Sequence, residues 1–224
     1  MWVKTNNTCA SWIHFDRLTS FTSKIYLFMR AIFLDMETTG LDSTRHFPIE
    51  IALKIVDVST SYHLTSYQTI INPSLKEWEK HDPISLEVNG FNWEEVSQGK
   101  ELKLVAKEII TLFSDLNIER GNAVYVCQNP AFDRGFFNHI IDVYTQEGFN
   151  WPYHWLDLAS MFWATLQHSL NRSESPFPTH LTVSKNDIAR AYHILPETQP
   201  HRAMRGVEHL ISCYEAVLGV KFRG

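Results

Sequence analysis

The chain has 224 residues, of which 44% are hydrophobic and 20% are charged, and its formal net charge at pH 7 is −5. This length suits one domain with a well-filled core, and the composition is that of an ordinary globular protein. Proteins that coat long nucleic acids are usually basic, so the acidic balance favours either an enzyme that engages a short end or a protein without a nucleic-acid partner.

Hydrophobic runs and cysteines exclude two further classes of protein. No apolar stretch approaches the roughly 18 residues of a membrane helix, and the longest, residues 25–34, is interrupted by Arg30 and indicates a buried strand. The three cysteines, Cys9, Cys127 and Cys213, are odd in number and far apart, which argues against a disulfide framework and a zinc site. We therefore expect reduced cysteines, a cytoplasmic location and no membrane partner.

The N-terminal part of the chain shows no clear pattern. Residues 1–23 have mixed polarity without a period, and they lack the basic start and apolar middle of a signal peptide. Met29 stands directly before the first clear strand. We expect residues 1–28 to be either a disordered extension or the product of a misassigned start, and residues 29–224 to form the domain.

The first half of the domain predicts a sheet and then helices. Three strands in succession, joined by polar turns, indicate an antiparallel meander: residues 31–35, 50–58 and 64–71. Residues 76–96 are helical and turn-like. Residues 101–113 carry apolar side chains at helical spacing and predict an amphipathic core helix.

In the second half, helices and strands alternate. Strands are expected at residues 123–127 and 155–158, and a polar, proline-containing loop at residues 169–179. The expected helices are residues 131–148, 159–167, 186–193 and 203–218. These elements predict an α/β or α+β fold, with a mixed central sheet and helices on its faces.

Two carboxylates end the first predicted strand. Asp35 and Glu37 are spaced i, i+2, so they point to the same side of the strand. Neighbouring carboxylates repel each other unless a cation lies between them, and hard oxygen ligands suit Mg²⁺ and Mn²⁺. Thr38, Thr39 and Gly40 follow at once, and the glycine lets the backbone approach a substrate. We expect a magnesium-type site at this edge of the sheet; the alternative is a solvated polar turn.

Two later features are weaker taken singly. Asp133 lies in the first turn of the helix that follows residues 123–127, where the helix dipole alone would favour an acid. His201 lies in the loop before the last helix, and the titration range of histidine suits proton transfer near neutral pH.

Taken together and in order, the motifs resemble those of the DEDDh 3′→5′ exonucleases. They are Asp-x-Glu-Thr-Thr-Gly at residues 35–40, Asn-x-x-Phe-Asp at residues 129–133 and His-Arg-Ala at residues 201–203. The family includes the proofreading epsilon subunit of bacterial DNA polymerase III, RNase T and oligoribonuclease. The resemblance spans residues 30–218, with further support from Pro-Ile-Glu-Ile-Ala at residues 48–52 and Trp-Leu-Asp at residues 155–157.

The resemblance implies an RNase H-like exonuclease fold and hydrolysis of the 3′-terminal phosphodiester of single-stranded DNA or short RNA. Two Mg²⁺ or Mn²⁺ ions would clamp the attacking and leaving oxygens. The metal ligands it implies are Asp35, Glu37 and Asp133, with His201 as the general base. The substrate contacts it implies come from Thr38, Thr39, Phe132 and Arg202. Phe132 also falls on the inner stripe of its helix, which favours a core role over base stacking. A DNA polymerase is an implied partner, and no feature indicates an oligomeric state.

One position departs from the family pattern. The family's last acid lies five residues after the histidine, where this chain has Gly206. The nearest acid, Glu208, lies about 200° around the helix from that position. Three outcomes stay open: a water fills the coordination position and leaves a slow nuclease, Glu208 reaches the site by a register change, or the chain binds without cutting. Arg202 and Arg205 add positive charge beside the site, either to hold a phosphate or as solvated helix residues.

We therefore expect first a metal-dependent 3′→5′ exonuclease, weakened by Gly206. The alternative from another class is a catalytically impaired nuclease fold that serves as a nucleic-acid-binding or replication-complex module. An unrelated α/β protein with chance motifs is the third interpretation.

Overall fold

The computed structural model describes residues 28–224. The expectations for residues 1–27, including Cys9, therefore concern a part of the chain that lies outside the described residues. Cys127 and Cys213 are free and buried. Within the described part, no helix is both long enough and apolar enough to cross a membrane.

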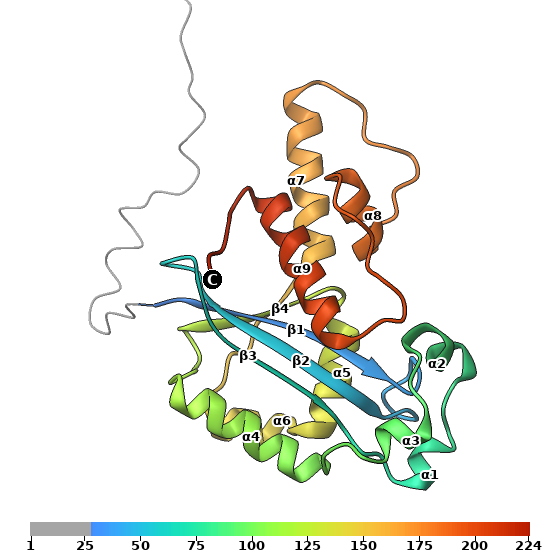
Figure 1. Cartoon of the computed structure of the whole chain (residues 1–224). Helices are drawn as coiled ribbons and strands as arrows, with labels where there is room; N and C mark the ends of the chain where they lie inside the picture. The colour runs from blue at the N-terminus through green and yellow to red at the C-terminus, as the bar shows by residue number, and fades with distance from the viewer. Residues whose placement is uncertain (1–27) are drawn as a thin grey trace, which may run out of the picture.

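A five-stranded mixed sheet forms the centre of the domain, in the order β3-β2-β1-β4-β5 (Figure 1). Its strands are β1 (Arg30–Thr38), β2 (Pro48–Asp57), β3 (Tyr62–Ile70), β4 (Ala123–Cys127) and β5 (Trp155–Asp157). The first three pair antiparallel, while β4 lies parallel to β1 and β5 parallel to β4. The predicted meander and the mixed sheet are confirmed.

Nine helices accompany the sheet within residues 28–224. Three short ones follow the meander: α1 (Leu75–Trp78), α2 (Pro83–Asn89) and α3 (Trp93–Val96). The others are α4 (Leu102–Asp115), α5 (Pro130–Ile140), α6 (Val143–Gly148), α7 (Leu158–Arg172), α8 (Lys185–Ala191) and α9 (Ala203–Leu218).

Two predicted helix boundaries were wrong. The single helix expected over residues 131–148 is divided into α5 and α6, because Ile141 is extended and the Asp142 side chain caps α6 by accepting from Tyr144 N and Thr145 N. The helix expected to stop at residue 167 continues to Arg172, which includes the first four residues of the expected loop.

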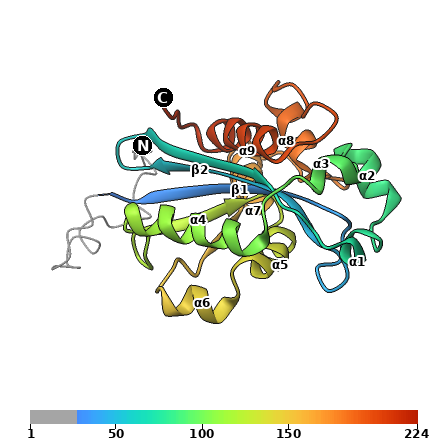
Figure 2. The same ribbon diagram turned by 60° about the horizontal axis from the view of Figure 1, so that its bottom comes forward.

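Alternating side chains of β1 divide the core into two layers. The even-numbered residues Ile32 and Leu34 pack with α4 and α5, and the odd-numbered Ala31 and Phe33 pack with α7, α8 and α9. Figure 2 shows α4, α5 and α6 on one side of the sheet and α8 and α9 on the other. Asp35 and Glu37 continue the odd-numbered row, so β1 presents them on the α9 side at its carboxyl end.

The segment from α1 to α3 covers that end of the sheet. Trp78, Phe91 and Val96 form a small apolar cluster with Ile49 of β2, which anchors the segment. Pro83 occupies the first turn of α2, and the Asp82 side chain caps it by accepting from Ile84 N. This segment forms one wall beside the predicted site.

Candidate functional site

A cleft of about 390 Å³ lies at the carboxyl end of β1. It is bounded by β1, α2, the beginnings of α5 and α8, and the loop that leads into α9. Five of the predicted site residues line it: Asp35, Glu37, Thr38, Phe132 and His201. Residues that are 166 positions apart in the chain thus meet at one hollow of ligand-binding size.

The three predicted acids influence one another electrostatically. Burial, followed by the charge of Asp35, raises the pKa of Asp133 well above its ordinary value. Burial and the charge of Asp35 also raise the pKa of Glu37, to about 8. Burial raises the pKa of Asp35 as well, against the opposing charge of Lys185. The structure therefore gathers three carboxyl groups whose pKa values burial raises.

His201 is placed by backbone contacts of the loop before α9. Its backbone N–H donates to the Val88 carbonyl of α2 over 3.0 Å, and its ring lies near enough to Asp35 to lower the pKa of that acid. The first turn of α9 begins directly after it, where the Ala203 N–H donates over 2.8 Å to the buried carboxylate of Glu50 on β2. An acid at a helix N-terminus is favoured by the helix dipole, so β2 fixes where α9 starts.

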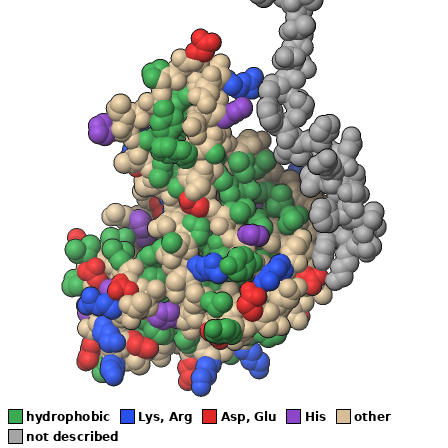
Figure 3. All heavy atoms as spheres, turned by 180° about the vertical axis from the view of Figure 1, so that it is seen from behind, with side chains coloured by type: hydrophobic (Ala, Val, Ile, Leu, Met, Phe, Trp, Pro, Cys, Tyr) green, Lys and Arg blue, Asp and Glu red, His purple; other side chains and the backbone are tan. Residues whose placement is uncertain are grey.

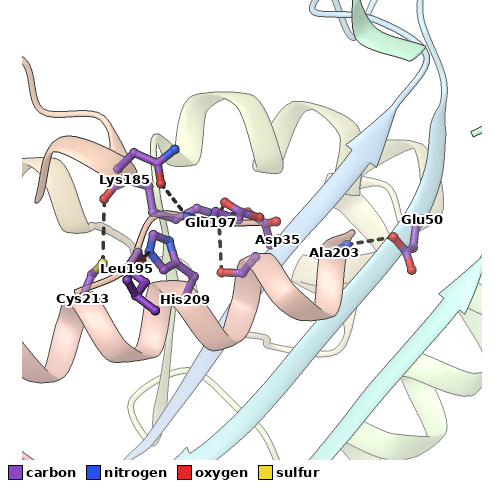
Figure 4. Close-up of polar contacts among 10 residues, drawn as sticks. Asp35, Glu50, Lys185, Leu195, Glu197, Ala203, His209 and Cys213 are labelled. Carbon is purple, nitrogen blue, oxygen red and sulfur yellow. Dashed lines mark hydrogen bonds and ion pairs between the residues drawn. The ribbon is translucent and has the colours of Figure 1, made fainter. Parts of the chain in front are cut away.

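Two residues that the sequence did not point to complete the cleft. The Lys185 Nζ lies 3.3 Å from Asp35 Oδ1 and 2.9 Å from Glu197 Oε2. Figure 4 shows Asp35 and Glu197 next to each other. Both side chains are almost wholly buried, Lys185 with 13% and Glu197 with 3% exposed. Burial alone would lower the pKa of Lys185, but the charges of Asp35 and Glu197 more than reverse this, so its ammonium stays protonated.

A signal for Lys185 does exist in the sequence. Ser184 caps α8, which puts Lys185 in the first turn, where the helix dipole disfavours a cation. A lysine at that position suggests a tertiary partner. Glu197 lies in an irregular loop, and its local sequence carries no such signal.

Gly206 allows α9 to approach β1 closely. A Cβ at this position would overlap the Asp35 carboxylate, lying 2.6 Å from its Cγ, and would lie 3.1 Å from Lys185 Nζ. The position therefore has no room for an acid while Asp35 stays where it is.

The alternative in which Glu208 replaces the missing acid is wrong. Its Oε1 pairs with Lys54 Nζ of β2 at 2.8 Å, and its side chain is 55% exposed. It faces away from the cleft, as its angular position on the helix indicated.

The two threonines have different surroundings. Thr38 lines the cleft, and its hydroxyl donates to the Gly40 carbonyl over 2.7 Å. Thr39 is fully buried: its hydroxyl accepts from Phe47 N, its N–H donates to Phe47 O, and its carbonyl accepts from Asp82 N. Because all its polar groups bind within the protein, we propose that Thr39 holds the turn and that Thr38 alone faces the substrate.

Phe132 and Arg202 also have partners within the protein. Phe132 lines the cleft, is half-buried and packs on Phe136 with ring centroids 4.9 Å apart, so it packs with its own helix, and its contact with substrate stays a prediction. The Arg202 guanidinium lies 3.8 Å from the Phe91 ring centroid and binds both carboxylate oxygens of Glu95, at 2.7 and 3.2 Å. We propose that Arg202 fixes the start of α9 to α3 instead of holding a phosphate.

The donor set does not fit two divalent ions as the side chains stand. Within residues 28–224, no three His, Cys, Asp or Glu side chains are arranged so that they could hold a metal ion. Asp35 Oδ1 already faces the Lys185 ammonium, and the family's fourth acid position is Gly206. The positive charge among these acids comes from the chain itself.

Comparison with known proteins gives one family and a consistent fold. The family model described as Exonuclease matches residues 32–213. No curated protein matches the chain.

Solved structures of similar fold include two of E. coli exonuclease I and one of the cell-death related nuclease CRN-4. The zinc-bound exonuclease I–ssDNA complex is 18% identical, with a TM-score of 0.65 over 85% of this chain and 40% of that chain. The complex with a dT13 oligonucleotide is 18% identical, with a TM-score of 0.64 over 84% and 41%. CRN-4 is 14% identical, with a TM-score of 0.63 over 86% and 64%. The chain thus spans about two fifths of exonuclease I, and the likeness confirms the expected RNase H-like exonuclease fold.

Proposed function

Because this chain belongs to the exonuclease family, we propose that it removes nucleotides from the 3′ end of single-stranded DNA or short RNA, at a rate reduced by the absence of the last acid. The observation that carries the proposal is the meeting of Asp35, Glu37 and His201 around one cleft, with the buried Asp133 near enough for the charges of Asp35 and Glu37 to act on it. These side chains come from a strand, a loop and a helix that are distant in sequence.

In this reaction His201 is the proton acceptor. It lies at the cleft beside Asp35, where its ring takes the proton of the attacking water. Divalent ions, which this family usually employs, supply charge to the attacking and leaving oxygens when they are bound. Because the described side chains, as they stand, do not fit two such ions, the two-ion arrangement of the family is not carried over to this chain.

An apolar rim supports a single-stranded substrate. Leu41 and Ile84 line the cleft with 76% and 70% of their surfaces exposed, beside the ring of Phe132. Unstacked bases of a single strand can pack on such side chains, whereas bases within a duplex cannot. The exonuclease I structures hold single-stranded DNA, which supports the same class of substrate here.

The charge pattern on one face of the protein fits a short contact with the nucleic acid. On the face shown in Figure 3, Lys and Arg side chains are interspersed with Asp and Glu instead of forming a continuous basic stripe. A long nucleic-acid path would need such a stripe. Binding of a terminal segment in the cleft needs none. A DNA polymerase partner and a cytoplasmic location stay predictions.

The test is digestion of a 5′-labelled single-stranded DNA oligonucleotide and its RNA twin, with Mg²⁺, with Mn²⁺ and with EDTA. We expect a ladder that shortens from the 3′ end, and the better substrate identifies the nucleic acid. The ladder is lost in Glu37→Gln and kept in the matched control Asp115→Asn, which changes an exposed acid at the end of α4. An equal rate in Glu37→Gln would mean that the activity does not come from this cleft.

A second function is favoured by one observation. Lys185 occupies one side of Asp35, and Gly206 replaces the last acid, so the cleft is also suited to holding a 3′ end without cutting it. This candidate predicts no ladder, together with tight binding of a 5′-labelled strand that weakens when its 3′-hydroxyl is replaced by a phosphate. Fluorescence anisotropy measures that difference directly.

A further inference from the structure

We propose that the Lys185 ammonium is a built-in cation that takes the place of a divalent ion in this cleft. The inference deepens the proposed function and rests on it only in assuming that this cleft is the working site. Lys185 Nζ lies between two carboxylates that it contacts directly, Asp35 at 3.3 Å and Glu197 at 2.9 Å. Its side chain enters the cleft from the first turn of α8.

Gly206 provides the space that this arrangement needs. Its carbonyl accepts from Lys185 Nζ over 3.4 Å, so the backbone of α9 is itself part of the ammonium's surroundings. A Cβ at residue 206 would lie 3.1 Å from that nitrogen and would overlap the Asp35 carboxylate. An acid at residue 206 and the Lys185–Asp35 pair therefore exclude each other. The departure from the family pattern and the lysine form one structural unit.

Glu197 is the second part of that unit. One of its oxygens pairs with Lys185, and the other, Oε1, is buried without a hydrogen-bond partner. Its backbone N–H donates over 2.9 Å to Asn186 Oδ1, the residue after Lys185, which fixes the loop to α8. A buried carboxylate is unfavourable without an adjacent cation, and Lys185 is the cation in contact with it.

The ammonium also acts on the other acids of the cleft. Its charge lowers the pKa of Asp35, Glu37 and Asp133, opposing the increase caused by burial. A divalent ion that entered here would have to displace Lys185 or lie beside a like charge. We therefore expect the protein to bind at most one divalent ion, weakly, and to be fully folded in EDTA.

Mn²⁺ binding to the full chain in the absence of nucleic acid tests the proposal. Electron paramagnetic resonance of free Mn²⁺ gives the number of bound ions and their dissociation constants. The variants are Lys185→Met and the matched control Lys54→Met, whose ammonium pairs with Glu208 at 2.8 Å outside the cleft. We expect Lys185→Met to tighten Mn²⁺ binding about tenfold or more, or to add a second ion, and the control to behave as wild type.

Two results would overturn the proposal. One is a wild-type protein that already binds two Mn²⁺ ions tightly, a measurement that holds even if Lys185→Met does not fold. The other is weak binding by the wild type without any gain in folded Lys185→Met. Because nucleic acid is absent, either result leaves the proposed function standing if the oligonucleotide ladder is seen. Conversely, if the wild type gave no oligonucleotide ladder, the proposed function would fail, but the number of bound Mn²⁺ ions would still test the role of Lys185.

Discussion

Replacement of Gly206 by alanine sets two physical effects against each other. In the first turn of a helix, alanine instead of glycine would stabilise the protein by up to about 1 kcal/mol through helix propensity. At this position the added Cβ would overlap the Asp35 carboxylate and lie 3.1 Å from Lys185 Nζ. Overpacking of this kind costs about 1–3 kcal/mol. We expect the overlap to dominate and the free energy of unfolding to fall by about 1–2 kcal/mol.

Urea unfolding at pH 7 in EDTA measures this change, with Gly148→Ala as the matched control. Gly148 ends α6 and has open space where a Cβ would lie, so the control should be neutral or slightly stabilising. In a domain of this size, the expected loss in Gly206→Ala lowers the melting temperature by about 2–8 °C. A variant as stable as the wild type, or more stable, would refute the close approach of α9 to β1 at Asp35.

Three further predictions concern the cleft and its walls. Burial raises the pKa of Glu37 from 4.5 to about 8, so the protonated carboxyl stabilises the folded protein fully below pH 4.5, and this stabilisation is lost as the pH rises towards 8. Glu37→Gln should therefore flatten the pH dependence of the free energy of unfolding between pH 4.5 and 8. Arg202→Lys loses the two-pronged contact with Glu95 and should lower the free energy of unfolding by about 1–2 kcal/mol, with unchanged oligonucleotide affinity. Ile84→Ser should weaken single-strand binding roughly fivefold, at constant stability.

Each of these has its own control. For the pH effect, an equal slope in wild type and Glu37→Gln between pH 4.5 and 8 would mean that Glu37 is not the group responsible. For Arg202→Lys, the control is Arg205→Lys, which changes an exposed arginine in the first turn of α9 and should be neutral. Weaker oligonucleotide binding by Arg202→Lys would mean that Arg202 contacts a phosphate after all. For Ile84→Ser, the control is Leu75→Ser, which removes an exposed apolar side chain outside the cleft. Leu75→Ser should leave the affinity for single-stranded oligonucleotide unchanged.

The sheet could be predicted because β1 to β3 are neighbours in both sequence and space. Their alternation and the polar turns between them carry the pairing pattern, and the i, i+2 spacing put Asp35 and Glu37 on one face. The break between α5 and α6 was missed because an apolar stripe continues through it. The helix breaks there because the Asp142 side chain accepts hydrogen bonds from the backbone and caps a new helix, α6.

The site was predictable only where the family motifs carry it. The cleft gathers Asp35, Glu37 and His201, all of which stand within those motifs. Lys185 and Glu197 meet Asp35 only because α8, a loop and α9 converge on the end of β1. That convergence is a tertiary property. The absence of a side chain at Gly206 indicated a lost ligand, but not the Lys185 ammonium that lies beside this position.

The most direct measurement is a crystal structure of the protein grown with Mn²⁺ and a short oligothymidine, with the anomalous signal used to locate Mn²⁺. Our account predicts Lys185 Nζ in contact with Asp35 and Glu197, and no more than one Mn²⁺ in the cleft. Two Mn²⁺ ions that share Asp35, with Lys185 turned away from both carboxylates, would contradict it.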